Sequence, residues 1–213
     1  MKSSLLFSVL VAMAIAASPA KADFVNGGFD TGNATGWTTA NLQPANSGVV
    51  SDSFVDSSSH GFILPHSPHF FASLSSDMLI DKNLPPTESN QIPAEFSQTI
   101  STTNGTSYGL SFWANILTSA TPGVSFRAYW DGTLLLNIQD PTGPSAGWVN
   151  YNYVVTGTGS DTVKFLGENI PRYNGLDDVS LTTALPGNLT TCGIAAVVGL
   201  GICGYRRRLA TRA

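Results

Sequence analysis

The chain has 213 residues, of which 42% are hydrophobic and only 11% are charged. All 14 acidic residues lie within residues 23–178, and this acidic stretch would repel phosphate backbones, which excludes nucleic acid as a partner. The two cysteines, Cys192 and Cys203, both stand near the C-terminus. The chain before them therefore has no disulfide framework and no thiolate metal site.

Residues 1–22 have the pattern of a secretory signal peptide. Lys2 gives a positive n-region, residues 5–17 are apolar apart from Ser8, and Ala20-Lys21-Ala22 fits the small-x-small cleavage pattern. The apolar run is shorter than the ~20 residues that a transmembrane helix needs, so a membrane span is the weaker interpretation. We expect the mature protein to be exported and to begin at residue 23.

The first half of the mature chain is rich in turn residues. Asn26, Gly27 and Gly28 favour a sharp bend, and turn-forming residues continue as far as Trp37. Strands are predicted over 48–54 and 70–74, with a polar loop over 56–68 between them. Residues 75–93 form the longest irregular segment, and long loops of this kind often carry function.

From residue 96 onward apolar and polar side chains alternate, which is the pattern of half-buried β-strands. Strands are predicted over 96–100, 108–113, 124–130, 133–138, 148–155, 162–166 and 176–181. Turns separate them at Asn104-Gly105 and at Asp131-Gly132, and the second dipeptide favours a tight hairpin. Because no helical period of any length occurs, we expect residues 23–184 to form an all-β domain, an antiparallel β-sandwich or jelly roll.

The last predicted strand carries two adjacent carboxylates. Strict alternation would place Asp177, Val179 and Leu181 on the inward face, and Leu176 and Asp178 on the other face. The two acids would then point in opposite directions and could not act as a general acid/base pair. A buried Asp177 needs a cation or several hydrogen-bond donors.

Residues 185–213 combine a Pro-Gly dipeptide, an apolar run rich in glycine and alanine, and an arginine cluster. The run over 191–205 approaches ~20 residues when 185–190 are included, and Arg206 to Arg208 would keep its C-terminal end in the cytoplasm. A buried core helix is the weaker interpretation, because the basic residues stand at the extreme C-terminus. We expect this segment to anchor or sort the protein at a membrane.

Three blocks of the sequence, residues 26–37, 96–113 and 176–181, resemble bacterial exported proteins that carry a carbohydrate-binding-module-like (galactose-binding-like) jelly roll. The tail is similar to the PEP-CTERM sorting signal recognised by exosortases, although Leu185-Pro186-Gly187 stands where Pro-Glu-Pro is expected. The resemblance implies a protein that is held at the inner membrane, processed by a sorting protease of the exosortase type, and then displayed at the cell surface or in the biofilm matrix.

The resemblance also implies a structural calcium ion that ties the first strand to the last. Carried over by position, its ligands would be Asp30, beside the glycine-rich bend, and Asp177. Glycine-rich turns beside carboxylates suit calcium, which takes roughly six to eight oxygen ligands. The alternative is that Asp30 makes only a turn hydrogen bond and that Asp177 accepts backbone donors.

A sugar site requires aromatic rings on a solvated face, beside side chains that can hydrogen-bond to hydroxyl groups. Alternation places Trp113, Arg127 and Tyr129 opposite the expected core positions, which are Phe112, Phe126 and Trp130. We expect the first three residues to form a shallow face that binds extracellular polysaccharide. The alternative is that these aromatic residues belong to the core or lie beneath loops, as most aromatic residues of sandwiches do.

We expect a non-enzymatic protein. The acids are too scattered to assign a glycosidase pair, and Glu88 in the long loop is the one active-site-like feature. His66 and His69 could approach a metal, but a solvated loop is the simpler interpretation. Two alternatives to a glycan-binding surface protein stay open: a purely structural surface protein without glycan affinity, and a polysaccharide hydrolase whose acids converge in one deep pocket.

Overall fold

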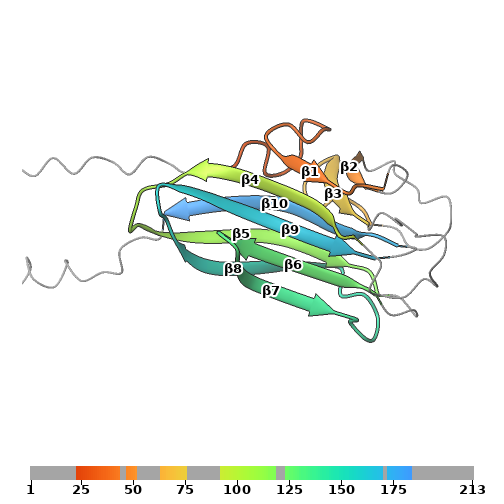
Figure 1. Cartoon of the computed structure of the whole chain (residues 1–213). Helices are drawn as coiled ribbons and strands as arrows, with labels where there is room; N and C mark the ends of the chain where they lie inside the picture. The colour runs from red at the N-terminus through yellow and green to blue at the C-terminus, as the bar shows by residue number, and fades with distance from the viewer. Residues whose placement is uncertain are drawn as a thin grey trace, which may run out of the picture.

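The computed structural model describes residues 23–43, 47–51, 63–75, 92–118, 123–169 and 172–183. The predicted signal peptide (1–22), the C-terminal segment (185–213) and Glu88 lie outside these ranges. Within them ten strands form two antiparallel sheets that pack face to face (Figure 1). The described part of the chain contains no helix with the length and hydropathy of a membrane span.

Each sheet has five strands, and the chain passes repeatedly between the two sheets. The first, called the β6 sheet below, has the order β1 (Thr38–Ala40), β4 (Ala94–Ser101), β9 (Ser160–Glu168), β6 (Ser125–Trp130) and β7 (Thr133–Gln139). The second, the β5 sheet, has the order β2 (Gly48–Ser51), β3 (Phe70–Leu74), β10 (Asn174–Thr183), β5 (Ser107–Ile116) and β8 (Trp148–Thr156). The edge strands β7 and β8 therefore lie on one side of the sandwich, and β1 and β2 lie on the other.

The strands predicted from residue 96 onward are confirmed, each to within a few residues. The strand predicted over 48–54 is seen as Gly48–Ser51, and its remaining residues lie outside the described ranges. Asp131 and Gly132 have φ of 46° and 76°, and positive φ at both positions is the conformation of the predicted tight hairpin. Strand β1 was not predicted, because three residues, Thr-Thr-Ala, carry no readable alternation.

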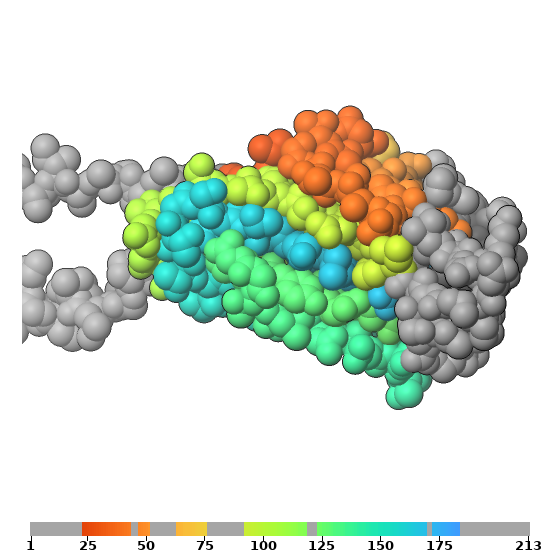
Figure 2. Space-filling view, in the orientation of Figure 1, coloured from red at the N-terminus to blue at the C-terminus, as the bar shows by residue number. Residues whose placement is uncertain are grey.

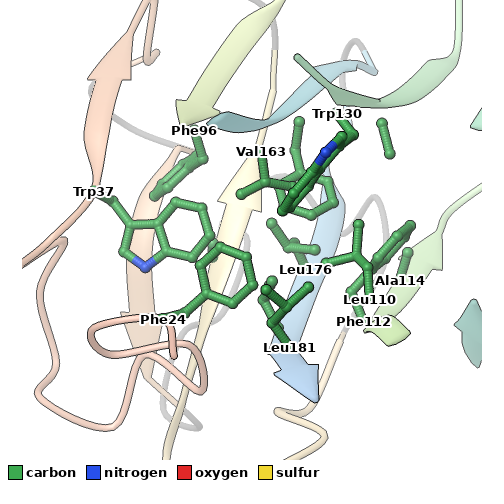
Figure 3. Close-up of a cluster of buried hydrophobic side chains, with 14 of the residues drawn as sticks. Phe24, Trp37, Phe96, Leu110, Phe112, Ala114, Trp130, Val163, Leu176 and Leu181 are labelled. Atoms are coloured by element: carbon green, nitrogen blue, oxygen red, sulfur yellow. The ribbon is translucent and has the colours of Figure 1, made fainter. Parts of the chain in front are cut away.

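The core lies between the two sheets and is dominated by aromatic rings (Figure 3). Phe112, Phe126 and Trp130 are buried there, as alternation predicted. The turn-rich N-terminal segment contributes Trp37, whose ring stacks on Phe24 at 5.9 Å. This segment therefore forms part of the hydrophobic core, which its turn chemistry did not predict.

Strand β10 departs from the predicted alternation. The register with β5 shifts between Asp177 and Ser180, and Asp178 takes a left-handed φ of 49°. This β-bulge resets the side-chain direction, so Leu176 shares the core face with Val179 and Leu181. The prediction that Asp177 is a face-mate of Val179 and Leu181 was therefore wrong.

Candidate functional site

The predicted glycan-binding residues lie on two different surfaces. Trp113 is on β5 and points away from the core, because its neighbours Phe112 and Ala114 are buried between the sheets. Arg127 and Tyr129 point away from the core on β6, which belongs to the opposite sheet. The structure thus brings Arg127 and Tyr129 together and separates Trp113 from them by the thickness of the sandwich.

The outer face of the β6 sheet is turned to the viewer in Figure 2, and no other described element lies in front of it. Arg127 forms an ion pair with Glu168 on β9, with Nη2 and Oε1 3.0 Å apart. The Ser125 hydroxyl donates to the other Glu168 oxygen at 2.9 Å. The buried Nε of Arg127 has no hydrogen-bond partner among the described residues. This arrangement holds the guanidinium group against the sheet and leaves its buried Nε–H available as a donor.

Tyr129 is the last outward-facing residue of β6, beside the hairpin turn that leads to β7. Its register partners are Lys164 on β9 and Leu134 on β7. The Lys164 amine lies 5.6 Å from the centre of the tyrosine ring, within cation–π range, and Leu134 is 49% exposed. A half-buried ring with an aliphatic side chain on one side and charged groups around it forms a shallow amphipathic platform, called the Tyr129 platform below.

Trp113 is covered by the chain itself. The His66 ring stacks on it at 3.8 Å with an interplanar angle of 20°, and Trp148 packs against the same histidine at 5.9 Å. Residues 63–69 lie across the outer face of the β5 sheet, where Ile63 is buried in a second apolar cluster with Phe71. One face of the Trp113 ring is therefore occupied by a protein side chain rather than free for a sugar.

His66 lies in an exposed loop, as the sequence suggested, but its ring and backbone are held against β10. Its Nδ1 lies 2.6 Å from Asp178 Oδ2, and its backbone N–H donates to Asp177 Oδ2 at 3.0 Å. The adjacent carboxylates thus reach the same short segment, and the prediction that they point in opposite directions was wrong because the bulge turns Asp178. Among the described residues no group of three or more histidine, cysteine, aspartate or glutamate side chains is placed to hold a metal.

Asp177 is fully buried, and its carboxylate accepts hydrogen bonds from four donors. These are the backbone N–H groups of His66, Ser67 and Asp178 and the Ser67 hydroxyl, at 2.8 to 3.2 Å. Burial nevertheless dominates and raises the pKa of Asp177 to about 6, with the nearby charge of Asp178 adding to the rise. The sequence analysis stated that a buried Asp177 needs either a cation or several hydrogen-bond donors, and these four donors meet the second condition.

The two predicted calcium ligands are not equivalent in their surroundings. Asp30 is exposed, and one of its oxygens lies 3.1 Å from the position that a Cβ on Gly28 would take, with an Asp178 oxygen 3.3 Å from the same point. Asp30 and Asp178 therefore flank Gly28, whereas Asp177 is turned toward Ser67. Both oxygens of Asp177 are already engaged by protein donors, so this residue fits a calcium ligand less well than Asp178 does. Calcium at Asp30 and Asp177 stays a prediction.

One carboxyl pair does have separated pKa values, but its surroundings indicate a structural role. Burial and a hydrogen bond with Asp161 raise the pKa of Asp131. Desolvation also pushes the pKa of Asp161 upward, but hydrogen bonds from Asp131, Thr102 and Thr158 outweigh it and hold this pKa below its usual value. The pair joins the hairpin turn at Asp131 to the turns at Thr102 and Thr158, so its hydrogen bonds hold these turns together.

A cavity of about 170 Å³ opens beside β7 and β8, lined in part by Ile138, Val149 and Tyr151. Its lining has hydroxyl and apolar groups but no carboxylate. The hydrolase alternative predicted acids converging in a deep pocket, and this cavity does not have that composition.

Sequence reasoning missed the partners that complete the platform, Lys164 and Glu168. Both lie on β9, which pairs with β6 in the sheet although the two strands are far apart in the sequence. The only sequence signal was their alternation with Val163 and Phe165, which places both on the outer face. Knowing that β9 pairs with β6 required the topology.

Comparisons with known proteins show the fold. No protein-family model and no curated protein sequence matches the chain. Among solved structures, the K3 cleaved adhesin domain of Lys-gingipain from Porphyromonas gingivalis is 16% identical, with a TM-score of 0.50 over 78% of this chain and 100% of that domain. A family 61 carbohydrate-binding module in complex with β-1,4-galactotriose is 16% identical, with a TM-score of 0.48 over 76% of this chain and 99% of that one.

The enzymatically active domain of tailspike protein 4 from bacteriophage CBA120 is 17% identical, with a TM-score of 0.47 over 75% of this chain. This chain spans only 21% of the length of that tailspike chain. At 16% identity the likeness to the adhesin domain shows a shared fold and nothing of the ligand.

Proposed function

We propose that the sandwich is a non-catalytic, carbohydrate-binding-module-like domain that binds polysaccharide on the Tyr129 platform. The observation that carries this proposal is the uncovered outer face of the β6 sheet (Figure 2). On this face the Tyr129 ring lies beside Lys164 and the Arg127–Glu168 ion pair. The sequence resemblance to exported proteins with such jelly rolls supports the same assignment. Trp113, which the sequence grouped with this site, is assigned to the packing of the opposite face.

The platform has the chemistry that a sugar ring requires. The C–H face of a pyranose packs on an aromatic ring, while its hydroxyl groups exchange hydrogen bonds with charged side chains at the rim. Arg127 and Glu168 are already paired, so they offer oriented donors and acceptors at little further entropic cost. A single shallow ring supports weak binding, with a dissociation constant on the order of 1 mM for one site.

A polysaccharide array with the purified full-length chain tests this proposal. Tyr129→Ala should weaken retention by the bound polysaccharide at least about tenfold, because a lost contact of ~1.4 kcal/mol corresponds to a tenfold change. Tyr129→Phe keeps the ring and should retain most of the binding. Trp113→Ala removes an aromatic side chain from the opposite face and is the matched control, which should bind as the unaltered chain does. Loss of binding in Trp113→Ala but not in Tyr129→Ala would place the site on the other sheet.

A structural surface protein without glycan affinity is the second candidate. It is favoured if no polysaccharide is retained at millimolar site concentrations while the fold is intact by circular dichroism. In that case the polar groups on the outer face of the β6 sheet serve solubility alone.

We also propose that the protein is exported and that residues 185–213 hold it at the inner membrane until a sorting protease of the exosortase type acts. The sequence patterns at the two ends of the chain support this. Deletion of 185–213 should release the protein from the membrane fraction. The same resemblance implies a calcium ion at Asp30 and Asp177, and we include this ion in the proposal. If a chelator leaves the melting temperature of the protein unchanged, the calcium ion is dropped from the proposal.

A further inference from the structure

The cavity of about 170 Å³ lies between the two sheets, at the side of the sandwich where β7 and β8 are the edge strands. Ile138 on β7 and Val149 on β8 line it from opposite sheets. Their register partners, Phe126 and Ala114, are buried in the core, so both side chains point inward. The cavity is therefore an opening into the interior of the sandwich, and it is separate from the outer face that carries Tyr129.

The loop that joins β7 to β8, residues 140–147, forms one wall of the cavity and is fastened near both of its ends (Figure 1). Asp140 Oδ1 accepts hydrogen bonds from two backbone N–H groups just before β6, at 2.7 and 3.1 Å. The Ser145 hydroxyl donates to the Ile116 carbonyl at 3.2 Å. Two prolines within the loop restrict its backbone further. This wall is thus formed before a ligand arrives, which lowers the entropic cost of binding.

Three side-chain hydroxyl groups line the cavity and are available to a ligand. They belong to Thr118, Thr142 and Tyr151, and none of these hydroxyl groups forms a hydrogen bond with another described residue. The Tyr151 ring is held in place by stacking on Phe112, with ring centres 5.6 Å apart. Burial, with a contribution from the nearby Tyr153 phenol, raises the pKa of Tyr151, so its hydroxyl keeps its proton and can donate.

The rest of the lining is apolar, and no charged side chain is among the described residues that form it. Ile116, Ile138 and Val149 supply the aliphatic surface, with alanine and proline residues beside them. A charged ligand does not fit this lining, because no opposite charge would compensate for its desolvation. An apolar cavity of about 150 Å³ holds a benzene ring. A cavity of about 170 Å³ therefore has room for one six-membered ring and not for two.

We propose that this cavity binds a single 6-deoxyhexose residue, free or at the end of a polysaccharide chain, with its methyl group against Ile138 and Val149. The ring hydroxyl groups of such a sugar can pair with the three hydroxyl groups of the lining. An aromatic hydrocarbon would leave all three without a partner, and an ordinary hexose would bury its 6-hydroxyl against aliphatic side chains. A 6-deoxyhexose avoids both costs, because its one apolar substituent meets the apolar wall.

Saturation-transfer NMR of the full-length chain in mild detergent tests this proposal with matched pairs of methyl glycosides. The pairs are those of L-fucose and L-galactose, L-rhamnose and L-mannose, and D-quinovose and D-glucose, and the members of each pair differ only in the 6-hydroxyl. At least one deoxyhexoside should bind with a dissociation constant on the order of 1 mM. Its parent hexoside should bind at least about tenfold more weakly, because its 6-hydroxyl is buried without a partner. Equal binding within every pair, or no binding of any deoxyhexoside at about 10 mM, would overturn the proposal.

Three variants locate the bound sugar. Tyr151→Phe should weaken binding of the deoxyhexoside about tenfold and leave the melting temperature unchanged, because the lost hydroxyl has no partner among the described residues. Tyr153→Phe is the matched control, since this ring also stacks on Phe112 but does not line the cavity. Ala146→Phe fills the cavity from an exposed position of the loop and should abolish binding. Binding that survives Ala146→Phe in a folded chain, or an equal loss in the two tyrosine variants, would place the sugar elsewhere and overturn the proposal.

Competition experiments on the same sample identify the form of the ligand. An oligosaccharide that ends in the bound deoxyhexose should displace the methyl glycoside if the ligand is a chain end, whereas only the free sugar displaces it if the cavity excludes longer chains. Tyr129→Ala should not change either result, because the cavity shares no residue with the Tyr129 platform and this proposal does not rest on that one. Phenol that binds more tightly than every deoxyhexoside would assign the cavity to an aromatic ligand and would contradict the proposal.

Discussion

Asp177 shows how one residue joins the last strand to a distant loop. Its carboxylate faces the same side of the β5 sheet as its register partner Trp113 and receives four donors, three of them from His66 and Ser67. Those donors stabilise the charge, yet the desolvation of a fully buried carboxylate outweighs them. Asp177 thus holds the loop over residues 63–69 on β10, although its ionised form is less stable in the folded protein than in the unfolded chain.

The raised pKa of Asp177 predicts how stability depends on pH. Because the pKa is about 6 in the folded state and has its ordinary value of 3.8 in the unfolded chain, the folded protein holds the proton more tightly. The contribution of this group is fully present below pH 3.8 and is lost as the pH rises through about 6, by at most about 3 kcal/mol. Asp178, Asp30 and His66 face the same region.

Asp177→Asn isolates this effect. The difference in unfolding free energy between the unaltered chain and the variant should shrink between pH 4 and pH 7, measured by urea denaturation at each pH. Near pH 5 the variant should be less stable by about 1–3 kcal/mol, because the Asn amide group turns an N–H toward donors that need an acceptor. A difference that stays constant with pH would show that Asp177 does not titrate in this range.

At the scale of elements, the N-terminal turn and the last strand are in backbone contact. The Val179 N–H donates to the Gly27 carbonyl at 3.0 Å, and a Cβ on Gly27 would lie 2.1 Å from the Val179 carbonyl oxygen. Only glycine allows this approach, because the obstacle is backbone and cannot move aside. The bulge at Asp178 and the glycine-rich bend are therefore complementary parts of one junction.

Gly27→Ala should disrupt this junction and lower the melting temperature by several degrees, through a loss of about 2 kcal/mol or more. Gly28→Ala is the matched control. Its added methyl group would meet side-chain oxygens of Asp30, Asp178 and Ser67, at 3.1, 3.3 and 3.6 Å, and no backbone atom is among these nearest contacts. Equal melting temperatures for the two variants, measured by circular dichroism, would count against a tight contact between residue 27 and β10.

Most of the strands could be predicted from the sequence, because alternation is a local signal that each strand carries by itself. The exceptions have physical causes. At β10 a bulge changes the side-chain period in the middle of the strand, and nothing in Leu-Asp-Asp-Val marks where the extra residue enters. For the site, alternation placed Trp113 and Tyr129 outside the core but could not say which sheet each strand joins.

At the scale of the whole molecule, the sandwich has two unlike outer faces. The β5 sheet is crossed by residues 63–69, which cover Trp113 and bury a second apolar cluster. The β6 sheet carries no such cover among the described residues and presents the Tyr129 platform (Figures 1 and 2).

The central claim is that the open face of the β6 sheet, and not the covered face of the β5 sheet, is where polysaccharide binds. Hydroxyl-radical footprinting of the full-length chain, with and without a retained polysaccharide, measures this directly at single residues. We predict that Tyr129 is protected from oxidation when the polysaccharide is added, while Trp113 and Trp148 react equally in both samples. Protection of Trp113 and Trp148 with no change at Tyr129 would contradict the account.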